Sequence, residues 1–205
     1  MWHVETISPA TEATLELLRD ASLLEGFYLA GGTALALHLG HRTSEDLDFF
    51  AEALFDEAIL LQYLQTLTDF HLVSQGPHTI HAGIQGTKVS FLGYAYPLLC
   101  PFAEFLRVRV ADIEDIACIK ISAIAARGTK RDFIDLYAAA QSSGLKPLLD
   151  RFGRKFAGSR QNMLHVLKSL TYFADAEKDP MPHMLVPMNW EDVKRFFLRE
   201  ALPLA

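Results

Sequence analysis

This 205-residue chain has only two cysteines, no long apolar run and few basic residues in its first half. Cys100 and Cys118 have neither the spacing of a metal site nor that of a disulfide framework. The apolar runs are shorter than the ~20 residues that a membrane-spanning helix needs. The first ten residues have no basic segment followed by an apolar one, so we expect no signal peptide. These absences argue against a disulfide scaffold or a membrane span and favour a reduced, cytoplasmic protein.

The charged residues are distributed unevenly along the chain. Residues 1–106 carry three basic and 13 acidic residues, whereas residues 107–205 carry 16 basic and 12 acidic ones. A basic second half favours the binding of a polyanion such as RNA, and chance variation of surface charge is the alternative. The range 151–174 has no acidic residue and five basic ones, which are Arg151, Arg154, Lys155, Arg160 and Lys168.

The first hundred residues mix helical and strand patterns. The periodicity predicts helices at 11–24, 33–39 and 53–70, and strands at 27–30, 46–50, 71–74, 79–84 and 88–93. Two of the links between strands are short turns, Gly76-Pro77 and Gln85-Gly86, so the sheet should be partly antiparallel.

The pattern changes after Pro97 and Pro101. A short strand is predicted at 106–110, and the rest is almost entirely helical, with helices at 113–127, 130–142, 145–157, 160–174 and 190–201. The sequence therefore predicts an α+β (mixed α/β) fold. We expect a core domain of residues 1–98 with a small mixed sheet, followed by a mainly helical domain of residues 99–205.

Residues 27–50, FYLAGGTALALHLGHRTSEDLDFF, hold the densest set of candidate functional residues. A buried strand leads into the turn Gly31-Gly32, and Thr33 can cap the helix that follows. The first N–H groups of a helix have no partner within it and bind phosphate readily. Gly31, Gly32 and Thr33 are therefore predicted to cradle a phosphate, with an ordinary turn as the alternative.

Two carboxylates, Asp46 and Asp48, stand two residues apart in an apolar run. On a strand, this spacing directs both side chains to one face and the apolar residues to the other. Two like charges so close repel each other unless a cation neutralises them, and hard oxygen ligands suit Mg²⁺. The pair predicts a metal site, with a solvated strand edge as the alternative. Arg42 and Ser44, just upstream, are within reach of a phosphate.

The spacing GG-x(13)-D-x-D resembles the signature of polymerase-beta-like nucleotidyltransferases. The longer string GGTALALHLGHRTSEDLDFF is similar to the AbiEii/AbiGii toxin branch, the nucleotidyltransferase half of abortive-infection and type IV toxin–antitoxin pairs. KVSFL at 88–92, Lys120 and ARGTKRDFIDLY at 126–137 also match, so the resemblance covers residues 27–137.

The resemblance implies an enzyme that uses Mg²⁺ to transfer a nucleoside monophosphate from an NTP to a hydroxyl acceptor. Together with the basic second half, it favours RNA, and tRNA above all, as the acceptor. It also implies a separately encoded antitoxin as the partner. Two alternatives stay open, a non-catalytic nucleotide-binding or partner-binding module and a small-molecule, antibiotic-type nucleotidyltransferase.

Three further residues are candidates for the same site. Lys120 falls on the apolar stripe of its helix, so its ammonium group must either reach solvent or meet an anion. The resemblance implies that it contacts the triphosphate of the nucleotide. If Lys120 serves the nucleotide, Lys120→Met should weaken NTP binding and leave thermal stability level or raise it, because a charge is removed from the apolar stripe. Asp132 and Asp135 share a helix face, and the resemblance implies that one activates the acceptor or orients Lys120 or Arg131.

The sequence departs from the polymerase-beta pattern at one position. Those enzymes usually carry a third carboxylate on a later strand, and the matching residue here is Ser90, a poor metal ligand and a poor base. Asp132 or Asp135 could supply the missing carboxylate, and Lys88 could bind phosphate. The histidines show no ligand spacing, and we expect His78 and His81 at the surface.

Overall fold

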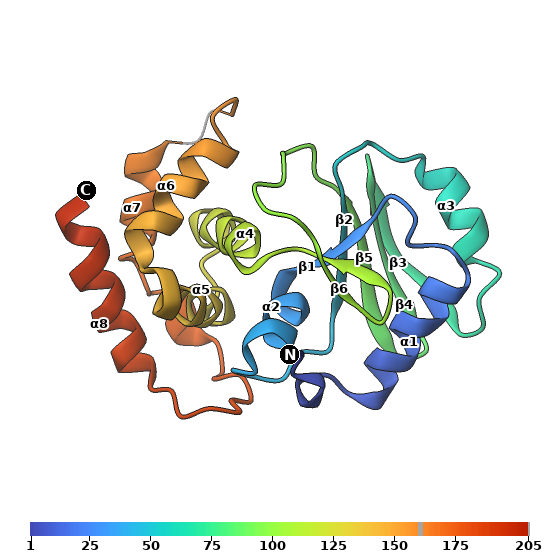
Figure 1. Ribbon diagram of the computed structural model, residues 1–205, viewed down its shortest axis with the longest axis horizontal. Helices are drawn as coiled ribbons and strands as arrows, with labels where there is room; N and C mark the ends of the chain where they lie inside the picture. The colour runs from blue at the N-terminus through green and yellow to red at the C-terminus, as the bar shows by residue number, and fades with distance from the viewer. Residues whose placement is uncertain (160–161, 205) are drawn as a thin grey trace.

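A computed structural model describes residues 1–159 and 162–204 and shows a mixed α/β fold (Figure 1). The strands are β1 Tyr28–Ala30, β2 Leu47–Ala51, β3 Phe70–Gly76, β4 Thr79–Ile84, β5 Thr87–Gly93, β6 Ala103–Phe105 and β7 Val108–Val110. The helices are α1 Pro9–Asp20, α2 Gly31–Leu39, α3 Glu57–Leu64, α4 Ile113–Ala126, α5 Lys130–Ser143, α6 Leu145–Lys155, α7 Met163–Ser169 and α8 Trp190–Ala201. The predicted fold class is confirmed.

All seven strands form one mixed sheet in the order β3-β4-β5-β2-β1-β7-β6. β3, β4 and β5 form an antiparallel meander, β5 runs parallel to β2, and β2 is antiparallel to β1. Within β2, Leu47 and Phe49 are buried in the core, whereas Asp48 and Phe50 project from the other face. The alternation of side chains along β2 thus gives the sheet one face toward the core and one face that can hold functional groups.

The sheet lies between two sets of helices (Figure 1). α1 and α3 cover one side, and α4 to α8 form a helical part on the other. α2 lies between the sheet and the helical part, because it packs against β1 and β2 as well as α4 and α5. The turn before α2 therefore faces both parts of the molecule.

Three local predictions are corrected by the structure. The helix predicted at 53–70 is the shorter α3, whose start is capped by Asp56. The strand predicted at 106–110 is instead a hairpin of β6 and β7, in which Leu106 and Arg107 both have positive φ. Thr33 is not the N-cap of α2, because that helix already begins at Gly31.

The sheet continues beyond residue 98, where a domain boundary was predicted. β7 pairs with β1 in parallel, and β6 pairs with β7, so residues 103–110 complete the sheet. The change to an all-helical chain comes at α4, after the N-cap Asp112. In the residues that the structure describes, no helix has both the length and the apolarity needed to cross a membrane.

Two connections join the helical part to the sheet. The segment 183–185 runs beside 41–43, where Thr43 donates its N–H to His183 and Leu185 donates its N–H to His41. Lys155 on α6 is fully buried and forms a 2.7 Å ion pair with Asp115 on α4. Lys155 also donates to the carbonyl of Pro97, so the segment that leaves the sheet is anchored to both helices.

Candidate active site

A cavity of about 510 Å³ lies between the sheet and α4. Its walls bring together the start of α2, the face of β2 that carries Asp48, and the facing residues of β5, β4 and α4. The lining includes these sequence-predicted residues: Gly31, Gly32, Thr33, Arg42, Ser44, Asp46, Asp48, Lys120 and Asp132. Nine residues predicted from motifs far apart in the sequence thus line one cavity.

The two glycines allow polar side chains to approach the start of α2. Gly31 has φ +69°, and a Cβ on it would lie 2.7 Å from Oδ2 of Asp48. A Cβ on Gly32 would lie 2.4 Å from a guanidinium nitrogen of Arg42. No side chain caps this helix, so its first N–H groups face the cavity without a partner in the helix. The helix start can therefore bind an anion.

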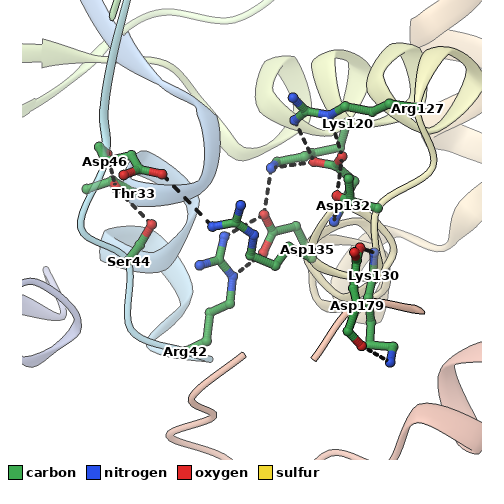
Figure 2. A network of polar contacts seen from close by, with 12 residues as sticks. Thr33, Arg42, Ser44, Asp46, Lys120, Arg127, Lys130, Asp132, Asp135 and Asp179 are labelled. Carbon is green, nitrogen blue, oxygen red and sulfur yellow. Dashed lines mark hydrogen bonds and ion pairs between the residues drawn. The ribbon is translucent and has the colours of Figure 1, made fainter. Parts of the chain in front are cut away.

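Thr33 and Ser44 hold the segment that precedes β2. The Thr33 hydroxyl is hydrogen-bonded to the carbonyl of Asp46 and lies 2.9 Å from the Ser44 hydroxyl (Figure 2). Both side chains line the cavity. The contacts fix the backbone at Asp46 relative to α2, so they position one carboxylate of the predicted metal pair.

Asp46 and Asp48 differ in their surroundings. The Asp46 side chain is 43% exposed, with Arg131 at 3.9 Å, whereas Asp48 is half-buried and forms no ion pair with the described residues. Burial raises the pKa of Asp48, the Ser90 hydroxyl and Lys120 act in the opposite direction, and the charge of Asp46 raises it further. Two carboxylates at one cavity, one of them without an ion-pair partner in the part of the chain that the structure describes, fit a divalent cation as the missing counter-charge.

A buried ion-pair network forms the other wall of the cavity (Figure 2). The ammonium group of Lys120 lies 3.0 Å from Asp132 and 2.7 Å from Asp135, and its side chain is 7% exposed. The long side chain therefore does not reach solvent; it meets anions within the protein. Burial alone would lower the pKa of Lys120, but the two aspartates outweigh it and raise that pKa.

Asp135 holds two other groups besides Lys120. Arg42 donates to both of its oxygens, at 2.7 and 2.8 Å, and His41 contacts it at 2.8 Å. Burial would raise the pKa of Asp135, but Lys120 and Arg42 hold it well below its usual value. Asp135 is completely buried and does not line the cavity, so it orients the two cations.

Asp132 is similarly occupied. It accepts from Lys120, from Arg127 and from the hydroxyl of Thr129, the N-cap of α5. Burial would raise the pKa of Asp132, but Lys120 and Arg127 lower it. A carboxylate with three donors and a lowered pKa is poorly suited to take a proton, so the structure favours the orienting role over the activating one.

Lys88 faces a neighbouring space rather than the main cavity. It lines a second cavity of about 460 Å³ that shares Arg42, Ser44, Asp46, Thr129 and Arg131 with the first. The far side of this second cavity is residues 179–183, which Asp179 attaches to the start of α5 by accepting the N–H of Lys130 at 2.9 Å.

Sequence reasoning missed several residues of the site. His81, expected at the surface, lines the cavity and lies 3.1 Å from the Ser90 hydroxyl. Arg127, to which the sequence assigned no role, also lines the cavity, as does Arg131 directly before Asp132. The alternation of β4 separates His81 from the buried Ile80 and Ala82, but the register between β4 and β5 decides which residue of β5 lies beside it. That register is not readable from a single strand.

Cys100 lies near two carboxylates, a proximity that cysteine spacing does not reveal. Its sulfur and one oxygen each of Asp112 and Glu114 lie within 4.8 Å of one another. Glu114 already pairs with Arg151 at 2.8 Å, and Asp112 caps α4. Burial and these carboxylates raise the pKa of the Cys100 thiol to about 12. The protonated thiol and occupied carboxylates explain the cluster without an ion.

The basic stretch 151–174 is only partly a surface patch. Lys155 is fully buried in its pair with Asp115, and Arg151 pairs with Glu114. Arg160 lies outside the described residues. Arg154 and Lys168 are exposed, and Lys168 lines a third cavity, of about 370 Å³, that shares Arg127 with the first.

The sequence matches a known protein family over most of its length. The model of a family described as "Nucleotidyl transferase AbiEii toxin, Type IV TA system" matches residues 15–95 and 94–203. An uncharacterized protein of Aquifex aeolicus (strain VF5) is 36% identical over 192 residues, which cover 91% of each chain. The chain belongs to the AbiEii family of nucleotidyltransferase toxins.

Solved structures agree with this assignment to the AbiEii family at the level of the fold. MenT4, a nucleotidyltransferase toxin of Mycobacterium tuberculosis H37Rv, has a TM-score of 0.56 at 19% identity, covering 91% of this chain and 82% of that one. JHP933 of Helicobacter pylori has a TM-score of 0.52 at 20% identity, covering 97% and 93%. The antibiotic-resistance factor ANT(2'')-Ia has 0.53 at 15% identity, covering 72% and 95%.

Proposed function

We propose that this AbiEii-family nucleotidyltransferase transfers a nucleoside monophosphate from an NTP to a hydroxyl group of RNA, most plausibly tRNA, with release of pyrophosphate. One observation carries the proposal: an open helix N-terminus, two carboxylates and a buried cation share the same cavity. A cleft of this composition suits the positioning and charge neutralisation by which phosphoryl-transfer enzymes act.

The residues have distinct roles in this proposal. Asp46 and Asp48 would hold Mg²⁺, which when bound neutralises phosphate charge. The N–H groups at Gly31, Gly32 and Thr33 bind phosphate oxygens, as the start of a helix favours an anion. Ser44, lining the same wall, would add a hydroxyl donor to a phosphate oxygen.

Lys120 and Arg42, which also line the cavity, would supply positive charge to the triphosphate. Both cations line the cavity and both pair with Asp135, which keeps them in place before the nucleotide arrives. Such a preorganised charge needs no rearrangement when the substrate binds. Lys88 faces the adjoining cavity, where it could meet a phosphate of either substrate.

The choice of RNA is supported by the cavity beside Arg127. That cavity is also lined by Lys168 and the exposed ring of Tyr172, a cation and an aromatic surface of the kind that bind a phosphate and a base. Because it adjoins the main cavity through Arg127, an RNA end held there would have its hydroxyl near the transfer site.

The test is transfer of label from each α-labelled NTP, with Mg²⁺, to total tRNA, other RNAs, aminoglycosides and proteins. Labelled tRNA is the expected result, and Asp46→Asn should abolish it by removing a metal ligand. Labelled aminoglycoside alone would favour an antibiotic-type enzyme. Binding of NTP and Mg²⁺ without labelling of any acceptor would favour a non-catalytic module.

A matched pair of charge reversals tests the RNA surface. Lys168→Glu should weaken tRNA binding and reduce its dependence on salt, because one phosphate contact is lost. Lys146→Glu is the control, since Lys146 is exposed on α6 and lines none of these cavities. Equal effects of the two variants would argue against this surface.

The biological setting follows from the family rather than from the site. As a type IV toxin, the protein would act in the cytoplasm, with a separately encoded antitoxin as its partner. Co-expression with a candidate antitoxin should relieve growth arrest caused by the wild-type chain, whereas Asp46→Asn should cause no arrest in the first place.

A further inference from the structure

Three neighbouring strands form the wall of the cavity opposite the buried ion pairs. Asp48 on β2 is paired with Ser90 on β5, and Ser90 is paired with His81 on β4. Directly paired residues project from the same face of a sheet, and all three of these side chains line the cavity. With strands about 4.8 Å apart, the three residues form a row roughly 10 Å long at the backbone.

The side chains of the row are neighbours. Nδ1 of His81 lies 3.1 Å from the hydroxyl oxygen of Ser90. Ser90 is the register partner of Asp48, and its hydroxyl offsets part of the burial that raises the pKa of that carboxyl. A hydroxyl has one proton to donate, so when Ser90 donates to the carboxylate it accepts from Nδ1–H of His81.

This direction of hydrogen bonding sets the tautomer of the imidazole. With the proton on Nδ1, Nε2 carries the lone pair, and it has no hydrogen-bond partner among residues 1–159 and 162–204. The cavity therefore contains an imidazole nitrogen with an unengaged lone pair, two strands away from the carboxylate that would hold the metal.

The other candidates for a base are already engaged. Asp132 and Asp135 are buried, each bound by two or more donors, and their pKa values are lowered. The proposed function assigns Asp46 and Asp48 to the metal. Among the described residues lining the cavity, His81 is the histidine, and no glutamate lines it.

We propose that His81 is the residue that accepts the proton of the acceptor hydroxyl, an inference that rests on the proposed nucleotidyl transfer. The acceptor oxygen bonds to the α-phosphorus while the bond from that phosphorus to the α–β bridging oxygen breaks. Pyrophosphate leaves with that electron pair, and the hydroxyl proton passes to Nε2 of His81. The imidazolium then returns the proton to water.

This assignment explains the serine at position 90. Polymerase-beta-like enzymes usually place a carboxylate at the matching position, and a serine cannot replace its basicity. Here Ser90 orients the neighbouring imidazole through a single hydrogen bond, so the base comes from β4 instead of β5.

The experiment uses His81→Gln, His81→Gly and a matched control, His71→Ala. His71 is an exposed histidine on the next strand, β3, and lines none of the described cavities. Single-turnover transfer to total tRNA is measured with the α-labelled NTP that the wild type uses, at saturating NTP and Mg²⁺. Calorimetry gives the NTP dissociation constant of each variant, and thermal melting confirms that it is folded.

Loss of a general base slows such reactions by roughly 10²–10⁴-fold, so His81→Gln should show a loss of this size with an unchanged NTP dissociation constant. Added imidazole should restore part of the rate to His81→Gly, whose cavity has room for it, and none to His81→Gln. His71→Ala should behave as the wild type.

Two results would overturn the assignment. One is a His81→Gln rate within a few-fold of the wild type; the other is a slow His81→Gly enzyme that imidazole does not rescue. Either could occur while the wild type still labels RNA, and the proposed function would then stand without His81. A wild type that binds NTP but labels no acceptor would instead refute the proposed function, and this inference with it.

Discussion

Replacing Lys120 by methionine tests whether the buried ion pairs hold the site together. The sequence predicts that this change leaves stability level or raises it, because a charge is removed from an apolar helix stripe. The structure reverses that prediction, since the ammonium group lies within 3.0 Å of both Asp132 and Asp135. Lys120→Met would leave two buried carboxylates short of a counter-charge.

The expected loss follows from the contacts that remain. Removing one partner of a buried ion pair costs about 3–5 kcal/mol of unfolding free energy. Asp135 would keep Arg42 and His41, and Asp132 would keep Arg127. We therefore expect the lower end, about 3 kcal/mol. For a chain of this size, that corresponds to a fall of roughly 6–12 °C in Tm.

Lys155→Met is the matched control for this experiment. Lys155 forms an equally short buried pair with Asp115, and Asp115 would keep the N–H groups of Leu99 and Cys100. The Lys155→Met variant should lose a similar amount of stability, but NTP binding should be unchanged because Lys155 does not line the cavity. Thermal melting and calorimetry of Mg²⁺-dependent NTP binding, both at a temperature where each variant is folded, separate the two roles.

Two results would refute this reasoning. A Lys120→Met protein as stable as the wild type would show that the ammonium group is not tied to the aspartates. Equal weakening of NTP binding by Lys155→Met would show that binding responds to general destabilisation rather than to the charge at the cavity.

Three more outcomes can be measured. Gly31→Ala should weaken Mg²⁺-dependent NTP binding in calorimetry, because the new Cβ would lie 2.7 Å from Asp48 at a backbone with positive φ. Asp48→Asn should abolish that binding yet leave Tm unchanged or higher at pH 7, because a raised carboxylate pKa costs stability above the ordinary value of 3.8. The ionisation of Asp135 affects stability in the opposite direction. Its lowered pKa stabilises the fold at pH values above 3.8, and this contribution is lost as the pH falls from 3.8 toward the lowered pKa. Asp135→Asn should therefore flatten the acid side of a plot of stability against pH.

The short-range features of the site were predictable from the sequence. The alternation of β2 correctly separates Asp48 from Phe49, and the helix predicted at 11–24 is α1, which begins two residues earlier at Pro9 with Ser8 as its N-cap. These features depend on residues a few positions apart, where strand period and helix capping act directly.

Features that depend on distant segments could not be predicted in the same way. The pairing of β7 with β1 moved residues beyond 98 into the sheet, and no local pattern encodes which strand a three-residue segment will join. Lys120 had two possible environments, and only the packing of α4 on α5 decided between them. His81 joined the site through register with Ser90, which a single strand does not reveal.

The contact between residues 41–43 and 183–185 has a consequence for how the protein is made. Both N–H bonds and the bridge between Arg42 and Met184 need a segment that is made much later in the chain than residues 41–43. During synthesis, every residue of the cavity has left the ribosome before that segment does, and the backbone beside Arg42 still lacks its final partners. A nascent chain therefore holds every residue of the cavity before the backbone support beside Arg42 can form, so the site is assembled in two stages.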